Sequence, residues 1–247
     1  YVQVPNQDLQ IDAYLAQPAK EGKFAAVMVF QEIFGVNANI REITELIAQQ
    51  GYIAIAPAMY QRIAPGFTRD FSPKDLAYSP EAYQIALQYY QQVQYQEIFS
   101  DIQATIAYLK MLPNVKADAI GCIGFCFGGH ISYMAATLPD LKATASFYGG
   151  GITTSSYGED IPTLDRTAQI QGAIYLFFGT KDHLVSQAES QQIEAELHQQ
   201  AEKLGLKEHI AFCGFDPDFA SLVGDADLFL LTSDEEGTPN VVLEAMI

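Results

Sequence analysis

The sequence predicts an α/β fold with a mostly parallel sheet and helices on both of its faces. Two observations lead to this prediction. Short apolar runs alternate along the chain with longer amphipathic stretches, as in proteins built from repeated strand–helix units. One of the runs, Ala119–Ile123, leads directly into the glycine-rich sequence Gly124-Phe125-Cys126-Phe127-Gly128, which is typical of a sharp turn from a strand into a helix.

Each predicted strand is an apolar run that ends at a glycine, a proline or a polar loop. These strands are residues 25–30, 52–56, 119–123, 144–148 and 173–178. In the first predicted helix, Ile40, Ile43 and Ile47 share one face, and Gly51 ends the helix. The predicted helices are residues 40–50, 80–95, 96–112, 126–138 and 186–200. Residues 61–80 and 152–168 are expected to form loops.

The composition excludes several classes of function. A net charge of −17 argues against nucleic acids and anionic membrane surfaces as partners. The chain shows no apolar run long enough to span a membrane and no signal peptide. Its three cysteines, Cys122, Cys126 and Cys213, suggest neither a disulfide framework nor a zinc site. We therefore expect a cytoplasmic protein without a metal or an organic cofactor, whose oligomeric state the sequence leaves open.

The glycine-rich turn has the pattern G-x-Cys-x-G, which matches the nucleophile elbow of α/β-hydrolases. Its glycines relieve crowding in the turn and lift the Cys126 side chain clear of the sheet. The following helix points its positive end at the thiol, which favours the thiolate, and the Phe127 N–H is placed to bind an oxyanion. The alternative is a buried cysteine in an ordinary strand-to-helix turn.

Two further strand ends carry carboxylates. Asp182 follows the strand at 173–178, so the chain order fits nucleophile, acid and then histidine. Glu32 follows the strand at 25–30, beside Ile33, whose N–H is a candidate for the second oxyanion donor. Ligands gather at the carboxyl ends of strands in open α/β sheets, so we expect these groups to meet near Cys126. The alternatives are a helix-capping or loop role for Asp182 and a solvated position for Glu32.

Four segments in this order, QEIFGVNANIRE, APAMYQR, GFCFGG and GTKDHLV, resemble the dienelactone hydrolase family (carboxymethylenebutenolidases) over about residues 10–200. The resemblance implies an α/β-hydrolase-like fold and a cysteine hydrolase that opens small lactones or esters. It implies Cys126 as nucleophile, Asp182 as triad acid and Glu32 as the resting partner of the thiol. The oxyanion hole would be formed by the backbone N–H groups of Phe127 and Ile33.

Other positions make the resemblance incomplete. Arg62 matches a family arginine near the site and is a candidate for substrate binding, whereas the helical arginine that binds a substrate carboxylate has no clear match in residues 75–95. The family histidine is expected near Ala211–Phe215, which contains none. The chain has four histidines, which are His130, His183, His198 and His209. We interpret each of them as structural or solvated. His209 lies nearest to the position expected for the family histidine. The sequence thus predicts impaired hydrolysis, and the alternative is an inert scaffold with a small-molecule pocket.

Residues 201–247 differ in character, with ten acidic and two basic residues. The stretch from Asp227 to Met246 resembles the C-terminal nucleotide-sugar half of a GT-B glycosyltransferase. That resemblance implies that Glu236 and Glu244 hold the sugar and the ribose, with Gly237–Asn240 at the phosphate. No basic counterpart for the phosphate is present. We therefore predict a chimera-like chain, with a hydrolase portion at 1–200 and a Rossmann-like segment at 201–247. This segment is expected to complete the sheet of the hydrolase portion. Nucleotide-sugar binding by the segment is the weaker alternative.

Overall fold

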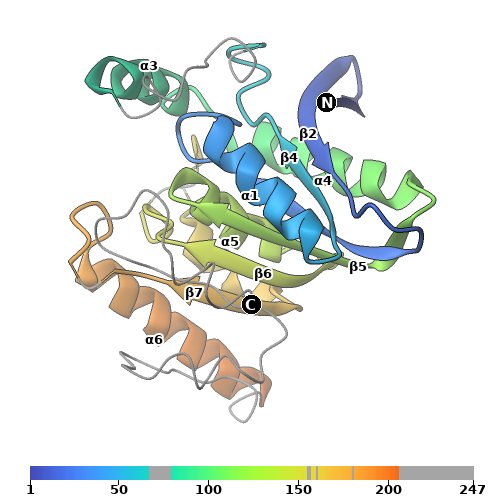
Figure 1. Ribbon diagram of the computed structural model, residues 1–247. Helices are drawn as coiled ribbons and strands as arrows, with labels where there is room; N and C mark the ends of the chain where they lie inside the picture. Colours follow the sequence, from blue (N-terminus) through green and yellow to red (C-terminus); the bar gives the residue numbers. More distant parts are fainter. Residues whose placement is uncertain (67–78, 155–156, 160, 180, 206–247) are drawn as a thin grey trace.

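A seven-stranded sheet forms the centre of the molecule (Figure 1), in the order β1-β2-β4-β3-β5-β6-β7. The computed structural model describes residues 1–66, 79–154, 157–159, 161–179 and 181–205. The strands are β1 (Val2–Asn6), β2 (Leu9–Ala16), β3 (Phe24–Phe30), β4 (Ile53–Pro57), β5 (Val115–Phe125), β6 (Leu141–Phe147) and β7 (Ala173–Phe177). The pairs β1–β2 and β2–β4 are antiparallel, and the remaining four pairs are parallel. The mostly parallel α/β sheet is therefore confirmed.

Helices cover both faces of this sheet, as predicted. They are α1 (Ala38–Gln49), α3 (Pro80–Tyr90), α4 (Tyr95–Met111), α5 (Phe127–Ala136), the 3-10 helix η1 (Thr163–Gln169) and α6 (Gln187–Leu204). Figure 1 shows α1 in front of the sheet, where Ile40 packs in one apolar cluster with Val29 and Ala56. The opposite face carries α4 and α5, which share a second cluster with β1 to β5. A third cluster joins α6 to α5 and η1.

Polar side chains fix the starts of three helices. Asn37 accepts a hydrogen bond of 3.1 Å from the N–H of Ile40 at the start of α1. Ser79 and Ser186 do the same for α3 and α6, each over 3.1 Å. These residues satisfy N–H groups that a helix leaves without internal partners, so the helix boundaries follow from local sequence.

The structure differs from the sequence prediction at three places. The antiparallel hairpin of β1 and β2 was not predicted, although Val4, Asn6, Ile11 and Ala13 alternate as a strand pair with one buried face should. The expected loop at 152–168 contains part of η1. Helix α6 continues past residue 200 to Leu204 and is closed by Gly205 in the left-handed conformation.

Within the ranges described, no helix is both long and apolar enough to cross a bilayer. The Rossmann-like segment predicted for residues 201–247 lies, from residue 206 on, outside the described residues. The boundary near residue 200 therefore stays a prediction.

Candidate active site

The backbone at Cys126 has the geometry of a strand-to-helix elbow. Cys126 is the N-cap of α5 and directly follows β5, with φ 54° and ψ −113°. Its N–H donates a hydrogen bond of 3.0 Å to the Phe147 carbonyl on the neighbouring strand β6. A non-glycine residue in the left-handed region is strained, and such residues concentrate at functional sites. The turn therefore carries the cysteine out of the sheet at the carboxyl end of β5.

The glycines of the elbow are required by close backbone packing. A Cβ on Gly124 would lie 2.0 Å from the Gly128 carbonyl oxygen. A Cβ on Gly128 would lie 2.2 Å from the Phe30 carbonyl oxygen at the end of β3. Both contacts are far shorter than carbon and oxygen allow, so larger residues at these positions would push α5 away from the sheet.

A buried glutamine fixes the segment that carries Glu32. The pairing of β3 with β5 places Phe30 opposite Gly124, so the residues after Phe30 lie beside the elbow. The fully buried Gln31 side chain accepts a hydrogen bond of 3.1 Å from the Met59 N–H and donates one of 3.3 Å to the Glu32 carbonyl. Glu32 itself is half-buried. The ends of β3 and β4 are thereby joined next to the nucleophile position.

Asp182 lies past the end of β7, as predicted. Its Oδ1 accepts hydrogen bonds from the N–H groups of Leu184 and Val185, over 2.7 and 3.0 Å. This arrangement holds the carboxylate in a fixed turn before α6 and is also what a loop-capping aspartate would make. Among the described residues, Oδ2 accepts no hydrogen bond, and the role of Asp182 as triad acid stays a prediction.

The carboxylates of Glu32 and Asp182 both influence the Cys126 thiol. Burial and then the Glu32 carboxylate raise the pKa of Cys126 from 9.0 to about 12, the Phe127 N–H hydrogen bond lowers it, and Asp182 raises it further. The resting thiol is neutral, so the expectation of a thiolate favoured by the helix start is wrong. Loss of water and two nearby carboxylates outweigh the positive end of α5.

The guanidinium group of Arg62 is bound to a buried carboxylate on α4. Its Nη2 lies 2.7 Å from Asp101 Oδ1 and its Nε 3.3 Å from Oδ2. Asp101, only 2% exposed, also accepts a hydrogen bond of 2.7 Å from Asn6 Nδ2. The interaction fastens the segment after β4 to α4 and β1. The role of Arg62 in substrate binding stays a prediction.

The histidines occupy different environments. His130 is fully buried in α5, with Nδ1 3.0 Å from the Gly150 carbonyl and Nε2 2.7 Å from Thr163 Oγ1. These contacts fit the interpretation of His130 as structural, which stays a prediction. His183 is exposed beside Asp182, and His198 is exposed on α6, 4.0 Å from Glu194. His209 lies outside the described residues, as do Cys213, Glu236, Glu244 and Gly237–Asn240.

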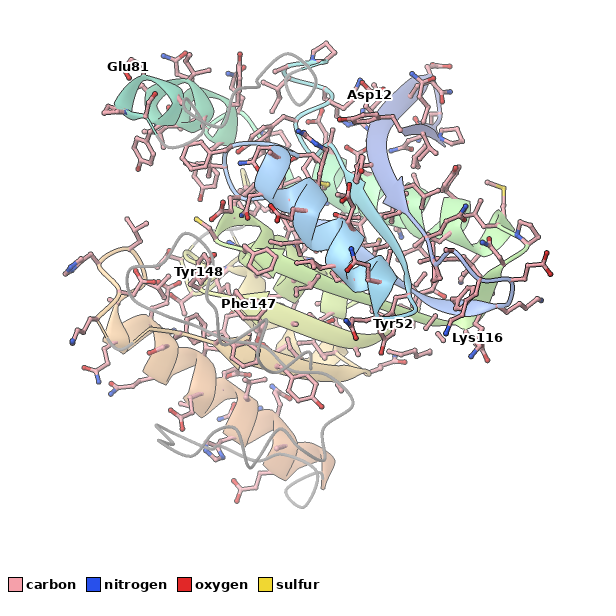
Figure 2. All side chains as sticks on the ribbon, in the orientation of Figure 1. Asp12, Tyr52, Glu81, Lys116, Phe147 and Tyr148 are labelled. Atoms are coloured by element: carbon pink, nitrogen blue, oxygen red, sulfur yellow. The ribbon has the colours of Figure 1, made fainter. Side chains whose placement is uncertain are left out.

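Sequence reasoning missed the aromatic surroundings of the elbow. The Phe127 ring is stacked on Tyr60 at 5.4 Å and meets the edges of Tyr90 at 5.4 Å and Tyr157 at 5.6 Å. These tyrosines come from three separate segments of the chain, so no local motif unites them. On the other side of the sheet, Phe147 and Tyr148 lie together at the end of β6 (Figure 2).

In the part of the chain that the structure describes, no three His, Cys, Asp or Glu side chains come together to hold a metal ion. A surface hollow of about 520 Å³ lies between the end of β2 and the end of α1. Its lining residues run from Ala16 to Lys20 and from Glu45 to Gly51, so it is separate from the strand ends that carry Cys126 and Glu32.

Comparison with known proteins indicates the family of this chain. The model of the dienelactone hydrolase family matches residues 11–218. A Synechocystis sp. protein, named provisionally as a carboxymethylenebutenolidase, is 50% identical over 196 residues, which cover 79% of this chain and 77% of the relative. The carboxymethylenebutenolidase of Pseudomonas sp. strain P51 is 30% identical over 181 residues, or 73% of this chain and 69% of the relative.

A solved structure is also similar. A Klebsiella pneumoniae protein, described provisionally as a dienelactone hydrolase, superimposes with a TM-score of 0.69 at 25% identity, over 81% of this chain and 79% of that protein. The likeness confirms the α/β-hydrolase-like fold. The family match includes residues 201–218, past the junction expected near residue 200. The glycosyltransferase resemblance of the tail gains no support from these comparisons and stays a hypothesis.

Proposed function

This chain belongs to the dienelactone hydrolase family, and we propose that it is a cysteine-dependent hydrolase of a small lactone or ester. The observation that carries the proposal is the strained elbow at Cys126, which aims a thiol from the start of α5 at the end of the sheet where Glu32 lies. The names of the Synechocystis and Pseudomonas relatives support a lactone as the substrate class.

In the proposed reaction, Glu32 takes the proton of the Cys126 thiol when a substrate enters. The thiolate then attacks the carbonyl carbon, and the Phe127 and Ile33 N–H groups hold the oxyanion. Two observations support these roles. The Phe127 N–H lowers the pKa of the Cys126 thiol, so it lies close to the sulfur, and the Ile33 N–H donates to no backbone carbonyl among the described residues.

Release of the acyl group is the slow step in this proposal. Water must attack the thioester, and a base oriented by Asp182 would normally assist it. His130 is occupied by Gly150 and Thr163, so it does not serve as that base. We propose that hydrolysis is impaired, with turnover lowered on the order of 10³-fold relative to a complete triad.

The test is a burst experiment with p-nitrophenyl acetate. We expect one equivalent of p-nitrophenolate to appear per protein, followed by slow turnover, with the acetyl group found on Cys126 by peptide mass spectrometry. Cys126→Ala should abolish the burst, whereas Cys122→Ala should keep it. A protein that is not acylated would support the alternative of an inert scaffold. Fast turnover would show that a base is present, and His209→Ala would then test whether it is His209.

For residues 201–247 we propose a structural role. The last strand of the described sheet is β7, whose outer edge pairs with no strand among the described residues, which supports a further chain segment beside it. Removing everything after Gly205 should therefore give an insoluble or molten protein. Calorimetry of the full chain with UDP-glucose should show no binding. Micromolar binding that Glu244→Ala abolishes would instead establish a nucleotide-sugar site.

The compartment follows from the chemistry proposed for the thiol. Cys122 and Cys126 are both free. A reducing compartment keeps such a nucleophile active, and we therefore propose a cytoplasmic location.

A further inference from the structure

The buried Gln31 holds a position next to the elbow that the proposed reaction does not use. It directly follows β3, and Glu32 and Ile33 come next in the chain. The backbone of this segment packs against the first turn of α5. A Cβ built on Gly128 would lie 2.2 Å from the Phe30 carbonyl oxygen and 2.7 Å from the Gln31 carbonyl oxygen. The peptide groups that follow β3 therefore lie beside the elbow.

Two hydrogen bonds fix the orientation of the Gln31 side-chain amide. Its Oε1 accepts a hydrogen bond of 3.1 Å from the Met59 N–H, and its Nε2 donates one of 3.3 Å to the Glu32 carbonyl. A backbone N–H only donates and a carbonyl only accepts, so turning the amide over would break both bonds. Because Gln31 is fully buried, water does not replace either partner, and the side chain is held in this one orientation.

The Glu32 carbonyl is also held from a second side. The Gly35 N–H donates a hydrogen bond of 3.3 Å to the same oxygen. The peptide group between Glu32 and Ile33 is planar, and a trans peptide points its N–H away from its C=O. Fixing the carbonyl oxygen at one end therefore fixes the direction of the Ile33 N–H at the other end. Among the described residues, that N–H donates to no backbone carbonyl.

We propose that Gln31 is a positioning residue of the oxyanion hole, and that its side chain directs the Ile33 N–H at the carbonyl oxygen of a bound lactone or ester. This inference rests on the proposed hydrolase function, in which Ile33 supplies one of the two backbone donors. The Gln31 side chain does not itself meet the substrate, because it is fully buried and both its amide oxygen and its amide nitrogen are bonded to the backbone. It acts through the peptide group that it holds.

The same hydrogen bonds strengthen the donor. They run from the Met59 N–H through the Gln31 amide to the Glu32 carbonyl, whose peptide group ends at the Ile33 N–H. An amide that accepts a hydrogen bond at its oxygen is polarised and donates better through its nitrogen. Because the donor is aligned before the substrate binds, little reorganisation is needed when negative charge develops on the carbonyl oxygen.

The test replaces the carbonyl oxygen that the oxyanion hole would bind. Acylation is followed by release of p-nitrophenolate from p-nitrophenyl acetate and from its thiono analogue, in which sulfur replaces the carbonyl oxygen. Sulfur accepts hydrogen bonds weakly, so the thiono ester should depend less on the two backbone donors. The ratio of the oxygen-ester rate to the thiono-ester rate should be higher for the unmodified protein than for N-acetylcysteine, a thiol without an oxyanion hole.

Gln31→Met fills a similar volume and removes both hydrogen bonds. We expect acylation by p-nitrophenyl acetate to fall about tenfold or more and acylation by the thiono ester to fall about threefold at most, so that the rate ratio falls. The same thiol attacks both esters, so a change in its pKa or exposure would leave the ratio unchanged. Gln31→Asn, whose amide is one methylene shorter and cannot reach both partners, should give an intermediate ratio.

Asn37→Ala is the matched control for a loss of stability. Asn37 lies in the same segment, is buried, and accepts a hydrogen bond of 3.1 Å from the Ile40 N–H at the start of α1. Its removal should lower the midpoint of urea unfolding, as Gln31→Met also should. The partners of the Glu32 carbonyl remain in place in Asn37→Ala, so its rate ratio should equal that of the unmodified protein.

Equal losses with both esters in Gln31→Met, or an equally lowered ratio in Asn37→Ala, would overturn the proposal. If Gln31→Met does not fold, the ratio for Gln31→Asn decides in the same way. Unmodified protein that neither ester acylates would contradict the hydrolase function and this proposal together. Unmodified protein that is acylated with the ratio of N-acetylcysteine would contradict the oxyanion hole and the role of Gln31 in it. A high ratio that both Gln31 variants retain would contradict this proposal alone.

Discussion

His130 and Thr163 join α5 to η1 through a hydrogen bond of 2.7 Å between Nε2 and Oγ1. The other ring nitrogen, Nδ1, lies 3.0 Å from the Gly150 carbonyl, which can only accept, so Nδ1 carries the proton. Nε2 then accepts from the threonine hydroxyl, and both ring nitrogens are satisfied in the neutral form. This histidine, one turn after Cys126, therefore holds the segment that follows β6 against the nucleophile helix.

Acid should weaken the fold through His130. Burial lowers its pKa from 6.5 to about 4, partly offset by the Gly150 carbonyl. Between these values the unfolded chain binds a proton that the folded chain does not, so stability is full above pH 6.5 and falls as the pH falls toward 4. We expect the free energy of unfolding to be about 2 kcal/mol lower at pH 5 than at pH 7. Urea unfolding at the two pH values measures this difference.

Two variants make this measurement specific. His130→Gln should be less stable than the unmodified protein at pH 7. Its free energy of unfolding should fall less on acidification, because the variant has no imidazole to protonate at this position. His183→Ala, at an exposed position, should keep the full pH dependence of the unmodified protein. An unchanged pH dependence in His130→Gln would show that carboxylates alone cause the decline.

Cys126 should react with iodoacetamide faster than Cys122. Burial raises the pKa of both thiols to about 12, so the thiolate fraction does not separate them. Solvent access separates the two thiols, because Cys122 is 4% exposed within β5 whereas Cys126 is half-buried at the elbow. The alkylation rate of Cys126 should rise about tenfold per pH unit from pH 7 to pH 10. Peptide mapping at successive times measures the rate at each cysteine. Preferential labelling of Cys122 would remove the elbow as the reactive position.

Glu32→Gln should have opposite effects on two reactions of the same thiol. Removing the carboxylate lowers the pKa of Cys126, so alkylation at pH 8 should be about three- to tenfold faster. Acylation by an ester should instead fall at least about tenfold, because the proposed proton acceptor is gone. Asp182→Asn should accelerate alkylation less, since Asp182 is the weaker influence. If both reactions slowed in Glu32→Gln, Glu32 would act by holding the structure rather than through its charge.

The parts predicted from sequence are those that one short segment specifies. The elbow could be predicted because Gly124, Cys126 and Gly128 stand together, and their backbone contacts require this spacing. The sheet could be predicted because its central strands are apolar runs buried on both faces. The hairpin at the start of the chain was missed because its alternation is short and includes polar residues such as Asn6, which is buried by its bond to Asp101.

The parts not predicted depend on contacts between distant segments. Nothing around Tyr60, Tyr90 or Tyr157 in the sequence indicates that all three contact Phe127. The prediction that Cys126 favours the thiolate was also wrong, because a helix start is visible in the sequence but the burial of the thiol is not. Motifs thus identify which residues meet, whereas the fold decides their electrostatic environment.

Arg62→Ala should reduce stability more than it alters substrate choice. The guanidinium group balances Asp101, whose carboxylate is 2% exposed, and Asn6 would remain as its partner. Leaving that charge without its counter-ion should cost about 3 kcal/mol in urea unfolding, and Arg62→Lys, which keeps the charge without the two-point contact, should cost less. Because the arginine is already paired, kcat/KM should change by the same factor for an ester that bears a carboxylate and for its neutral amide analogue. A rise in KM confined to the carboxylate-bearing ester, with stability unchanged, would show instead that Arg62 leaves Asp101 to bind the substrate.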